Sequence, residues 1–241
     1  MQRIKNPVLK NVDQTVVDRT NTATYLGVSI KTGILLLATI LSGVFAWFLL
    51  HTNPEAAITI LAVSGITTLV AVLLASFIPR LAMPFSILYS AAQGFSLGLI
   101  TIIADMAFPG IGMNAVVITI VIFGVMLALY SSRTIRATNK FRKIMFTILL
   151  SILVFSILSM IISPLRNLFI QNTGMALALS GFLIVYGAFM LILNFDQAEQ
   201  IVTHGAPKQY EWTVSLGLMI TIFWIYLEVL RFLIIILSNR D

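Results

Sequence analysis

Residues 213–237 read TVSLGLMITIFWIYLEVLRFLIIIL, an apolar stretch that is interrupted by two charged side chains, Glu228 and Arg231. A transmembrane helix needs about 20 predominantly apolar residues. The stretch is long enough, so it predicts a helix that crosses a membrane. The two charges need a separate explanation, because an ionised side chain inside a bilayer is costly.

The rest of the chain also has the composition of a membrane protein. Hydrophobic residues make up 59% of the 241 residues and charged residues 10%, whereas roughly 25% of a soluble globular domain is charged. We therefore predict an all-α integral membrane protein with seven transmembrane helices. The expected spans are 32–51, 57–79, 84–107, 113–131, 144–163, 173–195 and 213–237. Residues 1–31 are expected to form a polar N-terminal segment that is not a secretory signal, and residues 32–241 the membrane domain.

The distribution of Lys and Arg predicts how the chain is oriented, because cytoplasmic connections carry an excess of these residues. With the N-terminus in the cytoplasm, that side receives Arg3, Lys5, Lys10, Arg19, Lys31, Arg80, Arg133, Arg136, Lys140, Arg142, Lys143 and Lys208. The opposite side receives Arg166 and Arg240. We expect a cytoplasmic N-terminus and, after seven spans, a C-terminus outside. A re-entrant last segment would return the C-terminus to the cytoplasm.

The positive charge has an explanation within this membrane topology. The net charge is +6, and the most basic stretch is SSRTIRATNKFRKIM, residues 131–145. Such a connection sets the orientation and attracts anionic lipid headgroups, so we expect no binding to nucleic acid. The chain has no cysteine, which excludes disulfides and thiolate metal sites.

Glu228 is expected deep inside the last span. It follows Thr213 by about 15 residues, which places it roughly 20 Å into the membrane. Arg231 comes three residues later and shares a helix face with it. Two interpretations stay open: the pair neutralises itself and faces the bundle interior, or Glu228 is a step for an ion or a proton and is kept ionised by Arg231.

A second acid ends the sixth span, in LILNFDQAEQ at residues 191–200. The span descends towards the cytoplasm, so Asp196 is expected near the cytoplasmic mouth of the bundle. Composition alone favours a simple interfacial acid whose carboxylate reaches water.

The third span carries small and polar residues in ILYSAAQGFSLGLI, residues 87–100. Gly94 and Gly98 form a G-x-x-x-G pair, which lets another helix approach closely. Gln93 is expected near mid-depth, where a hydrogen bond across helices is commoner than a place in an ion path.

The residues favour neither an enzyme nor a resident cofactor. His51 and His204 fall in predicted connections, far from any cluster with metal-ligand spacing. The chain lacks the G-x-S-x-G, H-E-x-x-H, P-loop and dinucleotide fingerprints. We therefore expect a protein that is not an enzyme and that holds no metal permanently.

Four motifs follow one another in a characteristic order: NPVLKNV, AAQGFSLG, FDQAEQI and YEWTVSLGLMITIFWIYLEVLRFL. With their spacing, they resemble the Bax inhibitor-1/YccA family of membrane proteins. The opening motif and YLGVSIKTGILLL are similar to the bacterial branch, which has a longer N-terminal segment. The resemblance covers most of the chain.

The resemblance implies a bundle in which six helices surround a central seventh, and a pH-sensitive leak of calcium. It also implies a sensor made of two aspartates, one at the cytoplasmic end of the sixth helix and one on the seventh. Asp196 matches the first aspartate, whereas Thr221 stands where the second is expected. A threonine cannot share a proton with a carboxylate, so the family's two-carboxylate switch is in question here.

Two separated acidic positions then remain along the expected path. Asp196 lies at the inner mouth, and Glu228 lies about 10 Å beyond Thr221. Carboxylates and the Thr221 hydroxyl supply the hard oxygen ligands that calcium prefers. Arg80, at the cytoplasmic end of the second span, is the expected ion-pair partner of Asp196 when the path is closed.

Three functions stay open. The first is a pH-sensitive calcium leak of the bacterial inner membrane, in which carboxylates on the sixth and seventh helices line or gate the path. The second is a protein without transport activity that modulates a membrane protease, as some bacterial members of the family do, or another partner in the bilayer. A proton-coupled transporter is less favoured, because no interrupted half-helices occur in matching positions of two repeats.

Overall fold

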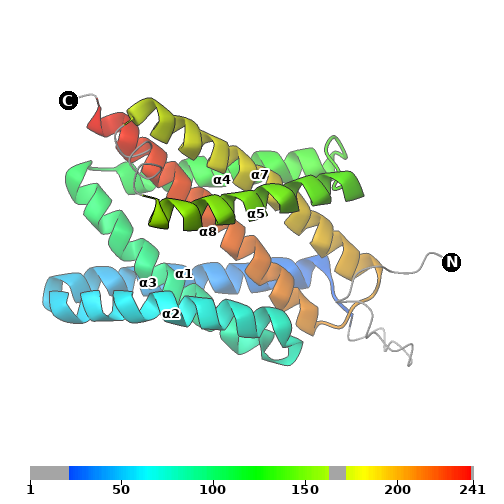
Figure 1. The fold of residues 1–241 in the computed structure, drawn as a ribbon. Helices are drawn as coiled ribbons and strands as arrows, with labels where there is room; N and C mark the ends of the chain where they lie inside the picture. The colour runs from blue at the N-terminus through cyan, green and yellow to red at the C-terminus, as the bar shows by residue number, and fades with distance from the viewer. Residues whose placement is uncertain (1–21, 163–171, 240–241) are drawn as a thin grey trace.

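The computed structural model describes residues 22–162 and 172–239, which form a bundle of long helices (Figure 1). The elements are α1 (Tyr25–Thr52), α2 (Pro54–Phe77), the short 3-10 helix η3 (Pro79–Leu81), α3 (Ala82–Ala107), α4 (Ile111–Ser131), α5 (Asn139–Ile161), α7 (Thr173–Thr203) and α8 (Gln209–Ser238). Within the described residues, seven helices are long and apolar enough to cross a membrane. The predicted class and number of spans are therefore confirmed.

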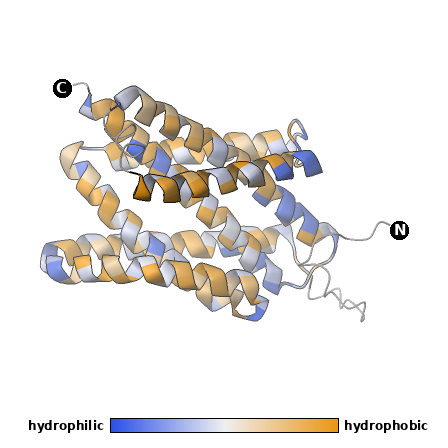
Figure 2. Ribbon diagram, viewed as in Figure 1, coloured by the Kyte–Doolittle hydropathy of each residue, from blue (hydrophilic) through white to orange (hydrophobic). Residues whose placement is uncertain are grey.

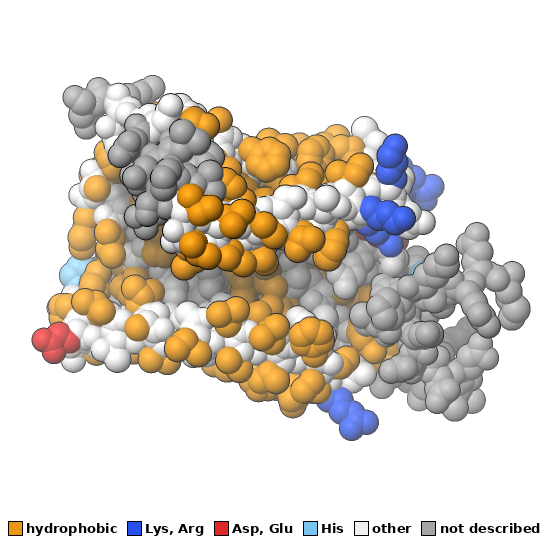
Figure 3. Space-filling view, viewed as in Figure 1, with side chains coloured by type: hydrophobic (Ala, Val, Ile, Leu, Met, Phe, Trp, Pro, Cys, Tyr) orange, Lys and Arg blue, Asp and Glu red, His pale blue; other side chains and the backbone are white. Residues whose placement is uncertain are grey.

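Hydrophilic residues of the bundle concentrate towards its ends, whereas hydrophobic residues predominate along its length (Figure 2). Large hydrophobic side chains are exposed along the outside of the helices, as expected where lipid replaces water. The Lys and Arg side chains visible in Figure 3 lie at one end. We call this the basic end; its described members are Lys31, Arg80, Arg133, Arg136, Lys140, Arg142, Lys143 and Lys208. The segment before residue 22 and Arg166 and Arg240 lie outside the described residues.

Helix α8 runs diagonally through the bundle and is its central element (Figure 1). It contacts α1, α2, α3, α4 and α7. Leu216, Met219, Ile225 and Leu230, spread along much of the helix, are almost fully buried, because a helix that is apolar on all sides belongs in the interior. Helix α5 is the exception: among the described helices it packs on α7 alone.

Several helices extend beyond the predicted spans into polar sequence. Helix α1 begins at Tyr25 rather than at residue 32, because the Thr24 side chain accepts a hydrogen bond from the backbone N–H of Gly27 and caps the helix. Helix α7 continues to Thr203, and its 31 residues are about 46 Å long. Since this exceeds the hydrocarbon thickness of a bilayer, about 30 Å, the last turns of α7 project from the hydrocarbon at the basic end.

Helices α1 and α3 approach each other through small residues. A Cβ placed on Gly98 would lie 2.7 Å from the Cα of Gly43, and one on Gly94 would lie 2.5 Å from the carbonyl oxygen of Thr39. The hydroxyl of Ser42 donates to the Ala91 carbonyl across the same interface at 2.6 Å. Glycine permits this backbone contact, which supplies the van der Waals packing that holds helices together in lipid.

We expect Gly98→Ala to destabilise the protein by about 1–3 kcal/mol, the usual cost of an overpacked interior. The added methyl group would meet the Gly43 backbone, which cannot move aside as a flexible side chain would. The measurement is the free energy of unfolding in mixed micelles, followed by circular dichroism.

The matched control is Gly65→Ala on α2, where a Cβ meets nothing within 4 Å. Equal stability of the two variants would contradict the close packing of α1 on α3.

Candidate functional site

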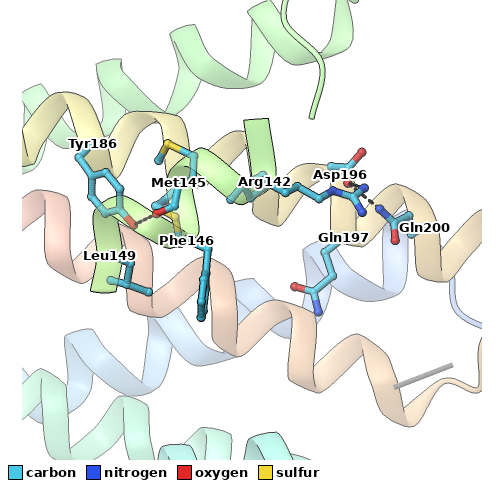
Figure 4. A pocket seen from close by; sticks show the side chains of 10 residues that line it. Arg142, Met145, Phe146, Leu149, Tyr186, Asp196, Gln197 and Gln200 are labelled. Atoms are coloured by element: carbon cyan, nitrogen blue, oxygen red, sulfur yellow. Dashed lines mark hydrogen bonds and ion pairs between the residues drawn. The ribbon is translucent and has the colours of Figure 1, made fainter. Parts of the chain in front are cut away.

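Asp196 lies at the basic end of α7 and is held by two side chains. The guanidinium of Arg142, in the first turn of α5, donates to its Oδ2 atom and forms an ion pair. The Gln200 amide, one turn further along α7, donates to the same oxygen at 2.6 Å. Figure 4 shows both groups pointing at the carboxylate, whereas Gln197 points away from it. Asp196 is therefore not a free interfacial acid, since its side chain is only 16% exposed.

The expected ion pair between Asp196 and Arg80 is wrong. Arg80 is exposed on η3, which contacts α2, α3 and α8 but not α7. The N-terminal part of α5 packs on α7 instead, where the Tyr186 hydroxyl donates to the Met145 carbonyl at 3.1 Å. This docking places Arg142 over Asp196. Sequence reasoning put both arginines at the basic end but did not indicate which helix would lie beside α7.

A second acid on α7, Glu199, was missed by the sequence analysis. Its Oε2 atom accepts from Arg136 at 2.8 Å and from the Tyr130 hydroxyl. The Arg136 guanidinium also lies over the Tyr130 ring, 5.2 Å from its centroid. The signal was present in FDQAE, because two acids three residues apart share one face of a helix.

Two clefts adjoin this part of α7, and each has one of the two acids in its wall. The cleft between α5 and α7 has a volume of about 330 Å³ and is lined by Arg142, Asp196 and Gln200 among apolar side chains (Figure 4). The cleft between α1 and α4 has a volume of about 690 Å³ and is lined by Arg136 and Glu199 at one end. An arginine that is paired with a carboxylate therefore stands in the wall of both clefts.

A third carboxylate, Glu211, ties α8 to the start of α1. It is 2% exposed, and it accepts hydrogen bonds from the Lys31 ammonium at 2.5 Å and from the backbone N–H of Thr24 at 2.7 Å. Lys31 also donates to the Lys208 carbonyl at 2.9 Å. The carboxylate of Glu211 and the ammonium of Lys31 both have hydrogen-bond partners inside the protein. Glu211 therefore acts as a structural anchor between α8 and α1.

Thr221 does not face Asp196. Its hydroxyl accepts a hydrogen bond from the Asn194 amide at 2.6 Å and donates to the Gly217 carbonyl at 3.1 Å. Asn194 and Thr221 are both buried. The α7–α8 interface therefore holds a neutral amide–hydroxyl pair near the position where the family resemblance implies a second carboxylate.

Glu228 and Arg231 do not form the self-neutralised pair that was one of the two interpretations left open by the sequence. Arg231 is exposed, and among the residues that the structure describes no ion pair joins it to Glu228. One carboxylate oxygen of Glu228 is buried without a hydrogen-bond partner in that structure, and so is the hydroxyl of Ser180 on α7. Glu228 is partly buried and lies near the Ser180 hydroxyl, whereas Arg231 is exposed and acts on Glu228 through its charge without forming an ion pair. Neither of the two clefts is lined by Glu228.

The other residues singled out from the sequence lie apart from these clefts. Gln93 is partly buried on α3, and its side chain makes no hydrogen bond to another described residue. His51 and His204 are exposed, and each has its Nδ1 atom within 2.8 Å of a carbonyl of its own helix. Across the described ranges, no three His, Cys, Asp or Glu side chains come together as metal ligands would.

The comparisons with known proteins agree with the fold. The family model described as "Bax inhibitor 1 like" matches residues 6–238 of the chain. No curated protein matches the chain, and no solved structure matches it.

The ion pair of Asp196 leads to a prediction about coupling. We expect the double-mutant cycle of Asp196→Asn and Arg142→Gln to give a coupling energy of about 0.2–1 kcal/mol, the range for partly exposed pairs. The measurement is the free energy of unfolding in micelles. The matched cycle with Arg80→Gln should be additive; coupling of Asp196 to Arg80 instead of Arg142 would contradict the arrangement described here.

Proposed function

The chain belongs to the Bax inhibitor 1 like family of membrane proteins, and from this premise we propose that it is a pH-sensitive cation leak. Calcium is the expected ion, and it is bound only in passage. The protein is a multi-pass membrane protein by its seven apolar helices. We further propose that it lies in a bacterial inner membrane with the basic end in the cytoplasm and the C-terminus outside, and that it is not an enzyme.

The observation that carries the proposal is the position of Asp196 in the cleft between α5 and α7. The arginine that pairs with it comes from the described helix that has the fewest neighbours. Arg142 belongs to α5, which contacts only α7 among the described helices. Met145 is the one buried residue of α5 in the described structure. Within the described residues, little packing on neighbouring helices opposes a displacement of α5 once the ion pair is broken.

The chemistry of the cleft suits a cation that competes with arginine. The Asp196 carboxylate and the amide oxygen of Gln200, whose amide nitrogen already donates to that carboxylate, are hard ligands of the kind that calcium binds. Both residues line the cleft between α5 and α7. Arg142 occupies the carboxylate in the closed arrangement, so an entering cation has to displace the guanidinium.

The same ion pair gives a gate without a second carboxylate. Arg142 blocks the Asp196 carboxylate while the two are paired, and loss of the negative charge at this position would remove the attraction. The other ionisable groups around this part of α7 are Glu199, Arg136, Arg133 and Tyr130. Glu199 is held by Arg136 in the same way, so the two acids tie α7 to α5 and to the connection before it.

The partly buried Glu228 is the second carboxylate of the proposed path. It lies on the central helix, towards the end opposite the basic end. One of its oxygens is buried beside the Ser180 hydroxyl, and we propose that the two groups serve an ion that has passed the basic end. Thr221 precedes Glu228 on α8, but its hydroxyl accepts a hydrogen bond from the Asn194 amide.

The test is calcium flux into liposomes that contain the purified protein, measured from about pH 8 down to about pH 5. The family resemblance implies a flux that depends on pH, and we expect the pairing of Arg142 with Asp196 to limit the wild-type flux at every pH. Asp196→Asn should raise the flux, since an amide holds the arginine weakly. Glu228→Gln should lower the flux at every pH.

The matched control is Glu55→Gln, which changes an exposed acid at the opposite end of the bundle and should leave the profile unchanged. If folded protein gives no flux above that of empty liposomes at any pH, the leak is wrong. The non-transporting role, modulation of a membrane protease or another bilayer partner, would then take its place.

A further inference from the structure

The cleft between α1 and α4 opens sideways, towards the surface that faces lipid. Helices α1 and α4 do not contact each other, although both pack on α7 and α8. Phe195 and Ala198 of α7 and Leu218 and Ile222 of α8 line the cleft behind them. The volume of about 690 Å³ falls in the range of natural ligand pockets, about 300–1,000 Å³.

The interior of this cleft suits a hydrocarbon chain. Ile120 and Leu127 on α4 and Leu36 on α1 line it and are exposed. Its deeper hydroxyls, Thr32 and Thr119, donate to carbonyls of their own helices at 2.9 and 2.7 Å. Since these groups are already satisfied, the deep part of the cleft presents an apolar wall.

The mouth of the cleft, in contrast, is polar and positively charged. Arg133, Arg136, Glu199 and Tyr25 line it at the basic end. Arg136 is paired with Glu199. Arg133 is exposed and feels the charge of Glu199, but it forms no ion pair within the described parts of the chain. The mouth therefore has one positive charge, that of Arg133, that is not neutralised by an ion pair among the described residues, and it lies beside an apolar cavity.

Arg133 is also held in an unusual backbone conformation. Its φ of 61° is the only positive φ of a non-glycine residue in the described ranges. This left-handed conformation costs an ordinary residue about 1–2 kcal/mol. The turn after α4 thus holds Arg133 at the mouth of the cleft despite a local cost in backbone energy.

We propose that this cleft is a binding site for an anionic phospholipid. One acyl chain lies between α1 and α4, and the phosphate group lies against Arg133, with the Tyr25 hydroxyl as a second donor. The charge of the mouth complements the phosphate, and the lateral opening lets the chain enter from the bilayer. The site is separate from the cleft that holds Asp196 and does not require that the protein conduct ions.

The headgroup part of the proposal is tested by native mass spectrometry of the purified protein, titrated with phosphatidylglycerol or with phosphatidylcholine of the same acyl chains. The wild type should bind phosphatidylglycerol more tightly. Arg133→Gln should weaken that binding about fivefold, as expected for one basic residue near a lipid surface, and leave phosphatidylcholine unchanged. The control Arg80→Gln removes an exposed arginine at the same end but outside the cleft.

The acyl-chain part is tested by filling the cleft. Gly33 lines it, and a Cβ at this position meets nothing within 4 Å, so Gly33→Leu should fold normally and lower the number of bound lipids. The control is Gly124→Leu, which lies on α4 outside the cleft lining and is equally unobstructed. Equal binding of the two lipids by the wild type, or bound lipid unchanged in Gly33→Leu, would overturn the proposal.

Discussion

Ionised side chains are costly in hydrocarbon, and this cost explains where the strong polar contacts of the protein lie. The ion pairs of the described structure, made by Glu211, Glu199 and Asp196, are all at the basic end. Each joins segments that are distant in the sequence: α8 to α1, α7 to the connection after α4, and α7 to α5. Packing of small and apolar residues holds the helices together inside the membrane, whereas charge fixes their ends.

Helix α7 has a different environment on each side, and the two candidate sites follow from this. On one side it contacts α5 through few groups, so that Arg142 and Asp196 make a large part of the contact. On the other side it forms the back of a cleft whose walls, α1 and α4, do not touch. One helix therefore carries the acid of the proposed cation site and, beside another cleft, part of the wall of the proposed lipid site.

The polar groups inside the membrane show how this chain departs from the pattern implied by its family. Asn194 and Thr221 form a neutral hydrogen-bonded pair between α7 and α8, and such a pair cannot gain or lose a proton near neutral pH. Any response to acid in this region has to come from ionisable groups. In the proposed mechanism, Asp196 and its arginine take the part that two aspartates play elsewhere in the family.

The sequence by itself determined the class, the seven helices and the concentration of charge at one end, because the length and hydropathy of a span depend on composition alone. It also singled out Asp196, Glu228 and the glycines of α3. Only the tertiary structure decided that Asp196 meets Arg142 rather than Arg80, that Thr221 bonds Asn194, and that Glu228 and Arg231 form no ion pair within the described residues. These contacts depend on the rotation of each helix about its axis and on which helices become neighbours. Side-chain packing sets the rotation of each helix and the choice of its neighbours. The sequence does not reveal either, because apolar residues occupy nearly every face of each helix.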